Sequence, residues 1–134
     1  MRIAFRADAS TQIGSGHVMR CLTLAEELAG RGVEIIFISR DLPDDYRTMV
    51  EGKGFPVIEL PKAVTDGGAL DWNAHASWLG VDWEQDADET IVALLNHQSD
   101  VDWLIVDHYA LDHRWEMCLQ AHVGQHGKIS LWIN

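Results

Sequence analysis

The sequence predicts an α/β domain in which a doubly wound parallel sheet is covered by helices on both faces. Short apolar runs alternate along the chain with segments whose apolar residues recur every three or four positions, the patterns of strands and amphipathic helices. One run, VEIIFIS, is continuously β-branched or aromatic, as in strands buried on both faces of a parallel sheet. Repeated strand–helix–strand units with short connections form such sheets. The 134 residues are expected to form a single domain, 1–134.

The first half of the chain supplies three strands and two helices. The apolar run RIAFRA predicts a strand over 2–7, and VEIIFIS predicts a second strand over 33–39. Between them, HVMRCLTLAEELAGRG has helical spacing and predicts a helix over 17–32 that stops at one of its two last glycines. DLPDDYRTMVEGKG predicts a turn and a short helix over 41–54, and FPVIEL predicts a strand over 55–60.

The second half of the chain repeats the alternation. DADETIVALLNHQ predicts a helix over 86–98, because its first turn is acidic, which complements the helix dipole, and its apolar residues share one face. VDWLIVDHY predicts a strand over 101–109, LDHRWEMCLQAH a helix over 111–122, and KISLWI a strand over 128–133. A Rossmann-like sheet of five strands is therefore expected.

A polar, glycine-broken segment joins the first strand to the first helix. Gly14 and Gly16 let the backbone turn tightly and approach a ligand with no Cβ in the way. The amides that open the helix, from Ser15 onward, point outward with the positive end of its dipole. His17 stands in the first turn, and Arg20 lies on the same side of the helix. Ligands of such sheets bind outside the carboxyl ends of the strands, so this loop is predicted to hold a small polar ligand.

Three better-known kinds of site do not fit the sequence. The dinucleotide fingerprint G-x-G-x-x-G fails because GSGHVM has Met19 at its third glycine. A phosphate-binding P-loop fails because no lysine precedes Lys53. His108, Asp112 and His113 lie close together in the sequence but without the spacing of a zinc site, so no metal is expected.

Residues near the predicted strand ends are further candidates. Asp107 and Tyr109 end a strand on the predicted ligand side and are candidates for binding substrate. Trp78 and Trp83 lie in an acidic segment, where they either stack on a sugar face or pack in the core. Trp103 lies within a predicted strand and is expected to be a core residue.

Charge and cysteine content limit the partners and the compartment. The formal net charge is −11, and the stretch between Ala63 and His113 holds eleven acidic residues and no Lys or Arg. Such a surface repels phosphate backbones and anionic lipid, so neither a nucleic acid nor a membrane is expected as a partner. Cys21 and Cys118 fall within apolar helical patterns, which predicts core positions rather than a disulfide. With no signal peptide or membrane span in the sequence, a cytoplasmic location is expected.

Several separate motifs resemble one enzyme family. GSGHVMRCLTLAEEL preceded by FRADAS, then WLGVDWEQDADET and DWLIVDHYALDHRWE, resemble the UDP-sugar hydrolases of pseudaminic acid biosynthesis. The resemblance runs from Met1 to about Ala121. That family is similar in fold to the GT-B glycosyltransferases that make peptidoglycan lipid II, so the resemblance implies the N-terminal domain of a GT-B fold.

The resemblance implies that a UDP-linked diacetamido-trideoxy sugar is hydrolysed to free sugar and UDP, without a metal or other cofactor. His17 matches the family's loop histidine, which is thought to act as the base that activates water for attack on the anomeric carbon, with inversion. Histidine titrates near neutral pH and so can accept that proton. The amides of 14–17, with Arg20, are expected to hold the diphosphate or the acyl groups. Asp8 is expected to reach the sugar hydroxyls or to orient His17.

The family has two doubly wound domains facing a cleft, and the second supplies most of the UDP site. This sequence resembles the first domain, and its residues 123–134 depart from the family pattern. We therefore expect a truncated chain that lacks the C-terminal UDP-binding domain and needs a separate C-terminal half. Two alternatives stay open: a non-catalytic sugar-binding or interaction half that pairs with such a chain, and an inert fragment.

Overall fold

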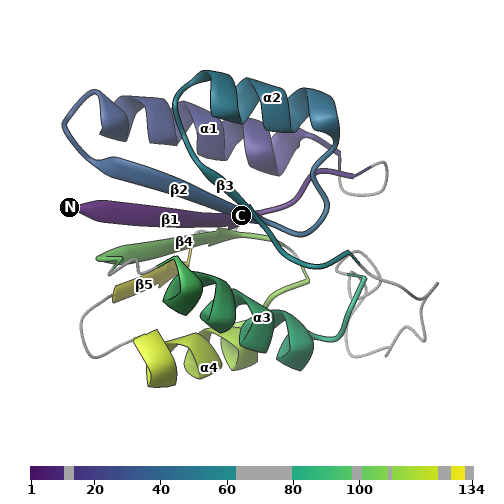
Figure 1. The fold of residues 1–134 in the computed structure, drawn as a ribbon. Coiled ribbons are helices and arrows are strands. Elements are labelled where there is room, and N and C mark those ends of the chain that lie inside the picture. The colour runs from purple at the N-terminus through teal and green to yellow at the C-terminus, as the bar shows by residue number, and fades with distance from the viewer. Residues whose placement is uncertain (11–13, 63–79, 98–100, 109, 124–127, 132–134) are drawn as a thin grey trace.

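The computed structural model describes residues 1–10, 14–62, 80–97, 101–108, 110–123 and 128–131. Its sheet has five parallel strands in the order β3-β2-β1-β4-β5 (Figure 1). The strands are β1 (Arg2–Ala7), β2 (Glu34–Ser39), β3 (Val57–Glu59), β4 (Trp103–Asp107) and β5 (Lys128–Leu131). The central position of β1 places the loop after it between the ends of β2 and β4. The predicted doubly wound parallel sheet is confirmed.

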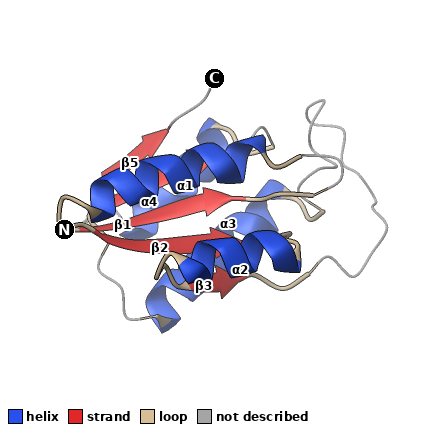
Figure 2. Ribbon diagram, turned by 90° about the horizontal axis from the view of Figure 1, so that it is seen from above, coloured by secondary structure: helices blue, strands red, loops and turns tan. Residues whose placement is uncertain are grey.

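Within the described ranges, four helices cover the two faces of this sheet. They are α1 (Gly16–Ala29), α2 (Asp44–Gly52), α3 (Trp83–Asn96) and α4 (His113–Val123). Helices α1 and α2 lie on one face, and α3 and α4 lie on the other (Figure 1). Viewed from above, α1 and α2 run roughly along the direction of the strands that they cover (Figure 2). The order of strands and helices along the chain is the one that the sequence predicts.

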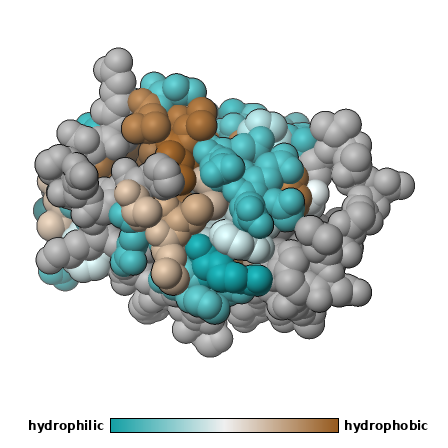
Figure 3. Space-filling model, turned by 90° about the horizontal axis from the view of Figure 1, so that it is seen from below, coloured by the Kyte–Doolittle hydropathy of each residue, from teal (hydrophilic) through white to brown (hydrophobic). Residues whose placement is uncertain are grey.

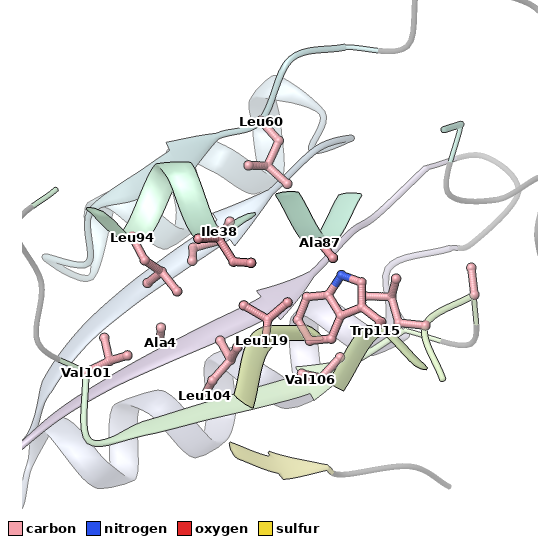
Figure 4. Close-up of a cluster of buried hydrophobic side chains, with 13 residues drawn as sticks. Ala4, Ile38, Leu60, Ala87, Leu94, Val101, Leu104, Val106, Trp115 and Leu119 are labelled. Carbon is pink, nitrogen blue, oxygen red and sulfur yellow. The ribbon is translucent and has the colours of Figure 1, made fainter. Parts of the chain in front are cut away.

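Alternation along the central strand divides the core into two layers. Ile3 and Phe5 of β1 pack with α1 and α2, and Phe5 stacks on Phe37 of β2 with ring centroids 5.2 Å apart. Ala4, on the opposite face, belongs to the layer under α3 and α4, in which Trp115 is fully buried (Figure 4). Successive side chains of a strand point to opposite faces, which fits a sheet buried on both sides.

The outer face of α3 and α4 is more polar than the face they bury. Seen from below, the coloured part of the surface has a hydrophilic area beside a hydrophobic one (Figure 3). Val92 and Leu95 of α3 and Met117 of α4 are exposed apolar side chains of these helices. Ile91 and Leu94 of α3 are buried but Leu95 is exposed, so the expectation that the apolar residues of this helix all share one face is wrong for Leu95.

Some element boundaries differ from the predicted ones for local reasons. Helix α3 begins at Trp83 rather than Asp86, because the carboxylate of Asp82 caps it by accepting a hydrogen bond from the Gln85 amide at 2.7 Å. The pair forms an N-cap motif that the sequence already contains, D-x-x-Q. Helix α1 ends at Ala29, and Gly32 then adopts a φ of +88°, a left-handed conformation that favours glycine.

Candidate functional site

The described ends of the loop after β1, Ser10 and Gly14, lie side by side, and Gly14 is followed directly by the start of α1. The Gly14 amide donates to the Ser10 carbonyl at 2.7 Å, and Gly14 has a φ of +77°. Only glycine adopts this conformation without strain, which accounts for Gly14. Ser15 is the N-cap of α1, and its side chain accepts no capping hydrogen bond from the first amides of that helix. Gly16 begins the helix, and a Cβ built there meets nothing within 4 Å among the described residues.

The loop histidine lies against the end of β4. Nδ1 of His17 is 2.6 Å from Oδ1 of Asp107. The two residues are 90 positions apart, but β1 pairs with β4 in a register that places Ala7 beside Asp107. The turn after β1 therefore carries His17 to the last residue of β4. Both side chains are largely buried.

Arg20 completes this group, which we call the His17–Asp107–Arg20 cluster. Its Nη2 donates to Oδ1 of Asp107 at 2.6 Å, and its Nε donates to Oδ2 of the same carboxylate. The Arg20 side chain is 31% exposed, so one edge of the cluster reaches the surface. Burial by itself raises the pKa of Asp107, but hydrogen bonds from Arg20 and His17 outweigh burial and lower that pKa. The carboxylate is thus held ionised between a histidine and a guanidinium.

This geometry determines how His17 can act. A carboxylate only accepts hydrogen bonds, so the proton of the neutral ring lies on Nδ1, facing Asp107. The lone pair of the ring is then on Nε2, which becomes the basic nitrogen. An aspartate that holds a histidine in this way fixes its tautomer and stabilises the imidazolium formed when the ring accepts a proton. The pair is therefore suited to general-base chemistry.

The expectation that Asp8 orients His17 is wrong. The Asp8 side chain is fully buried. Its Oδ1 accepts from Nη1 of Arg6 at 2.8 Å and from the Arg40 amide at 2.7 Å, and its Oδ2 lies 3.0 Å from Nε2 of His108. Its position after a central strand brings it inside the protein rather than to the ligand side. Asp107 takes the orienting role that the sequence suggested for Asp8.

Sequence reasoning missed a buried charge cluster, formed by Arg6, Asp8, Arg40 and Asp86. The carboxylate of Asp86 accepts from Nη2 of Arg6 at 2.6 Å and from Nη2 of Arg40 at 3.1 Å. It also accepts from the indole Nε1 of Trp115 at 2.9 Å. Burial lowers the pKa of Arg6, but the charges of Asp8 and Asp86 raise it further than burial lowers it. An arginine within the apolar run RIAFRA is the signal in the sequence that points to such a cluster.

Acidification is expected to destabilise the protein through these carboxylates. Burial opposes ionisation of Asp8, Asp86 and Asp107, but their cationic and hydrogen-bonding neighbours set each pKa below its ordinary value. Groups with a depressed folded pKa stabilise above the unfolded pKa of about 3.9, and this contribution is lost as the pH falls. Asp41 and Glu116, whose pKa values burial raises, offset part of the loss. Urea unfolding should give a free energy that drops steadily from about pH 5 downward, and a constant value down to pH 3 would contradict the expectation.

The other candidate residues pack in or against the core, or lie outside the described part of the chain. Trp103 packs on the core, as predicted, and Trp83 packs on the other core layer with the Arg114 guanidinium 5.2 Å from its ring centroid. Cys21 is buried and Cys118 is half-buried, and no disulfide joins them in the described part of the chain. Burial and the nearby charge of Asp107 raise the pKa of the Cys21 thiol. Two candidates, Tyr109 and Trp78, lie outside the described residues.

A hollow of about 460 Å³ lies between β3 and α3, lined by Ile58, Leu60, Pro61 and Val92 among others. Its lining includes none of the sequence-predicted site residues. Within the described ranges, no group of three or more His, Cys, Asp or Glu side chains is arranged to hold a metal ion. The helices of the same ranges include none long and apolar enough to cross a membrane.

Comparison with known proteins gives one partial sequence match and clear structural likeness. No protein-family model matches the chain. An uncharacterised protein of Methanocaldococcus jannaschii is 43% identical over 60 residues, which are 44% of this chain and 12% of that protein. This chain therefore spans a small part of that relative.

Two solved plant enzymes share the fold over nearly the whole chain. A UGT transferase from Siraitia grosvenorii, solved in complex with UDP, is 17% identical with a TM-score of 0.58, over 98% of this chain and 27% of its own. UGT2 of Phytolacca americana, complexed with UDP-2fluoro-glucose and pterostilbene, is 16% identical with a TM-score of 0.68, over 98% of this chain and 29% of its own. The chain therefore has the Rossmann-like α/β fold found within GT-B UDP-glycosyltransferases, and it spans less than a third of each of these chains.

Proposed function

We propose that this chain carries the catalytic base of a nucleotide-sugar hydrolase, with a UDP-linked diacetamido-trideoxy sugar of pseudaminic acid biosynthesis as the substrate. The observation that carries the proposal is the 2.6 Å contact between His17 and Asp107 at the carboxyl ends of the strands. Doubly wound sheets bind their ligands at this edge. The structural neighbours solved with UDP or a UDP-sugar support a nucleotide-sugar ligand, and the sequence motifs support hydrolysis as the reaction.

The proposed reaction uses one water molecule and one proton acceptor. Nε2 of His17 takes a proton from water while the water oxygen attacks the anomeric carbon. The bond from that carbon to the diphosphate oxygen breaks, its electron pair leaves with UDP, and the configuration inverts. Asp107 stabilises the imidazolium, which then returns its proton to solvent. General-base catalysis of this kind contributes about 10²- to 10⁴-fold in rate.

Charge on the leaving group is proposed to be balanced by the start of α1. Amides in the first turn of a helix point at an anion along the positive end of the dipole, and residues 14–17 lie at this position. The part-exposed Arg20 guanidinium lies three residues further along the same helix. Arg20 also donates to Asp107, the partner of His17. It would therefore connect the diphosphate leaving group to the catalytic base. Tyr109, close behind Asp107 in the sequence, remains a candidate for contacting substrate.

Substitution of the base tests the proposal. We expect His17→Ala to lower UDP release from the UDP-sugar by about 10²- to 10⁴-fold, because the variant has no proton acceptor. Release is measured chromatographically with purified chain. His113→Ala, at an exposed histidine that begins α4, serves as the matched control and should leave release unchanged. UDP release by the original chain that persists in His17→Ala would refute the role of His17.

A second candidate function, sugar binding without catalysis, is supported by the fold likeness to two proteins solved with UDP or a UDP-sugar. In this alternative the chain is a sugar-binding or interaction half that pairs with a separate C-terminal half. Calorimetric titration with the UDP-sugar and with UDP alone separates the two functions. Binding without release, with release restored by adding a C-terminal half, would favour the alternative.

A further inference from the structure

A second histidine–aspartate pair, His108 and Asp8, lies beside the pair of His17 and Asp107, and both of its side chains are buried. Nε2 of His108 is 3.0 Å from Oδ2 of Asp8, and Nδ1 of His108 accepts from the Ala110 amide at 3.1 Å. A ring nitrogen that accepts from a backbone N–H carries no proton, so the His108 ring is neutral and its proton lies on Nε2. His108 is 5% exposed, and both of its nitrogens are engaged. It therefore cannot serve as a base, and its role is to hold structure.

Asp8, the partner of His108, is itself fixed from two strands. It receives the Arg6 guanidinium from β1 and the Arg40 amide from the residue after β2. The Asp41 amide lies 3.3 Å from the same oxygen, Oδ1. The carboxylate is thus a rigid anchor at the carboxyl ends of β1 and β2, and His108 fastens the end of β4 to it.

The two pairs interlock because Asp107 and His108 are consecutive. Asp107 is the last residue of β4, in register with Ala7 of β1, and its side chain is turned toward His17 and Cys21 of α1. His108 follows at once, with its side chain turned toward Asp8. The backbone of Asp107 is therefore held by the strand ladder on one side and by the His108 ring on the other.

We propose that Asp8 and His108 form a positioning pair that holds the Asp107 carboxylate against His17 and so keeps His17 in its Nδ1–H tautomer. Neither residue touches the reacting atoms, and each acts through Asp107. The catalytic meaning of this pair rests on the proposed function, since it prepares His17 to act as a base. The opposite tautomers of these two histidines, with that of His17 controlled by His108, do not depend on any substrate.

Nitrogen-15 NMR of the imidazole rings tests the proposal on the chain alone. In the original chain, His17 is expected to show the Nδ1–H tautomer and His108 the Nε2–H tautomer. His108→Gln keeps an N–H that can donate to Asp8, so it should preserve the His17 signal. His108→Leu removes the donor at similar size, so His17 should lose its single-tautomer pattern and give a mixture. Circular dichroism of both variants reports whether the fold is retained.

An unchanged His17 signal in folded His108→Leu would overturn the proposal, as would the Nε2–H tautomer at His17 in the original chain. If His108→Leu does not fold, Asp8→Asn replaces it, because asparagine keeps the shape of the anchor but removes its charge. The same loss of the His17 pattern is then expected, and an unchanged pattern overturns the proposal. Because these spectra need no UDP-sugar, failure of the hydrolase assay and failure of the positioning pair are distinguishable.

Discussion

Replacing Asp86 with asparagine is expected to lower the free energy of unfolding by about 3–5 kcal/mol, the range for removing one partner of a buried ion pair. Asp86 is fully buried and accepts hydrogen bonds from Arg6, Arg40 and Trp115. Asparagine has nearly the same shape, so the loss comes from charge rather than from a cavity. The buried guanidinium groups of Arg6 and Arg40 would then lose one of the carboxylates that balance their charge.

Urea unfolding at neutral pH measures this loss. Asp88→Asn is the matched control, because Asp88 is an exposed residue of the same helix, two positions further on. It is expected to change stability by less than about 0.5 kcal/mol, as surface substitutions usually do. A loss under about 1 kcal/mol for Asp86→Asn would mean that the buried charge cluster is not a main support of the fold.

Replacing Asp107 with asparagine is expected to lower kcat for UDP release by about 10²- to 10⁴-fold, if the proposed hydrolase function holds. The neutral amide cannot stabilise the imidazolium of His17, and an NH₂ group turned toward Nδ1 favours the wrong tautomer. Arg20 would also lose the carboxylate to which both its Nε and Nη2 donate. The measurement is the UDP-release assay, with Asp112→Asn as a control at a half-buried aspartate of the loop before α4.

Residues that act as one unit lose activity non-additively. The double variant of His17→Ala and Asp107→Asn should therefore be no slower than His17→Ala alone. Two fully additive losses would show that Asp107 acts independently of the histidine, for example by binding substrate directly. Such a result would return Asp107 to the substrate-binding role expected from its place at a strand end.

The local pattern of apolar residues is sufficient to predict the order of the strands and helices along the chain. The β-branched run of β2 and the three- and four-residue spacing of α1 are properties of consecutive residues, and short-range geometry decides them. The start of α3 was predicted three residues late, although Asp82 and Gln85 form an N-cap motif in the sequence. Boundaries depend on single hydrogen bonds of this kind, which periodicity alone does not weigh.

The sequence identifies individual candidate site residues, but it does not identify which of them contact one another. The glycine loop, His17 and Arg20 follow from the strand-to-helix connection, and Asp107 follows from its place at a strand end. Local sequence patterns do not determine that β4 pairs with β1. The contact between Asp107 and His17 therefore could not be predicted from them. For the same reason Asp8, the acidic residue nearest to the loop, was assigned the wrong partner.

By itself the sequence determined that this protein is a doubly wound α/β domain with a polar, glycine-broken loop after its first strand, because hydrophobic periodicity and glycine placement are local. Only the tertiary structure decided which aspartate serves which histidine, and that Arg6 meets Asp86 across 80 residues of chain. Strand order brings such distant groups together. Once they are buried, these charged groups must be paired, because an uncompensated charge inside a protein strongly destabilises the fold.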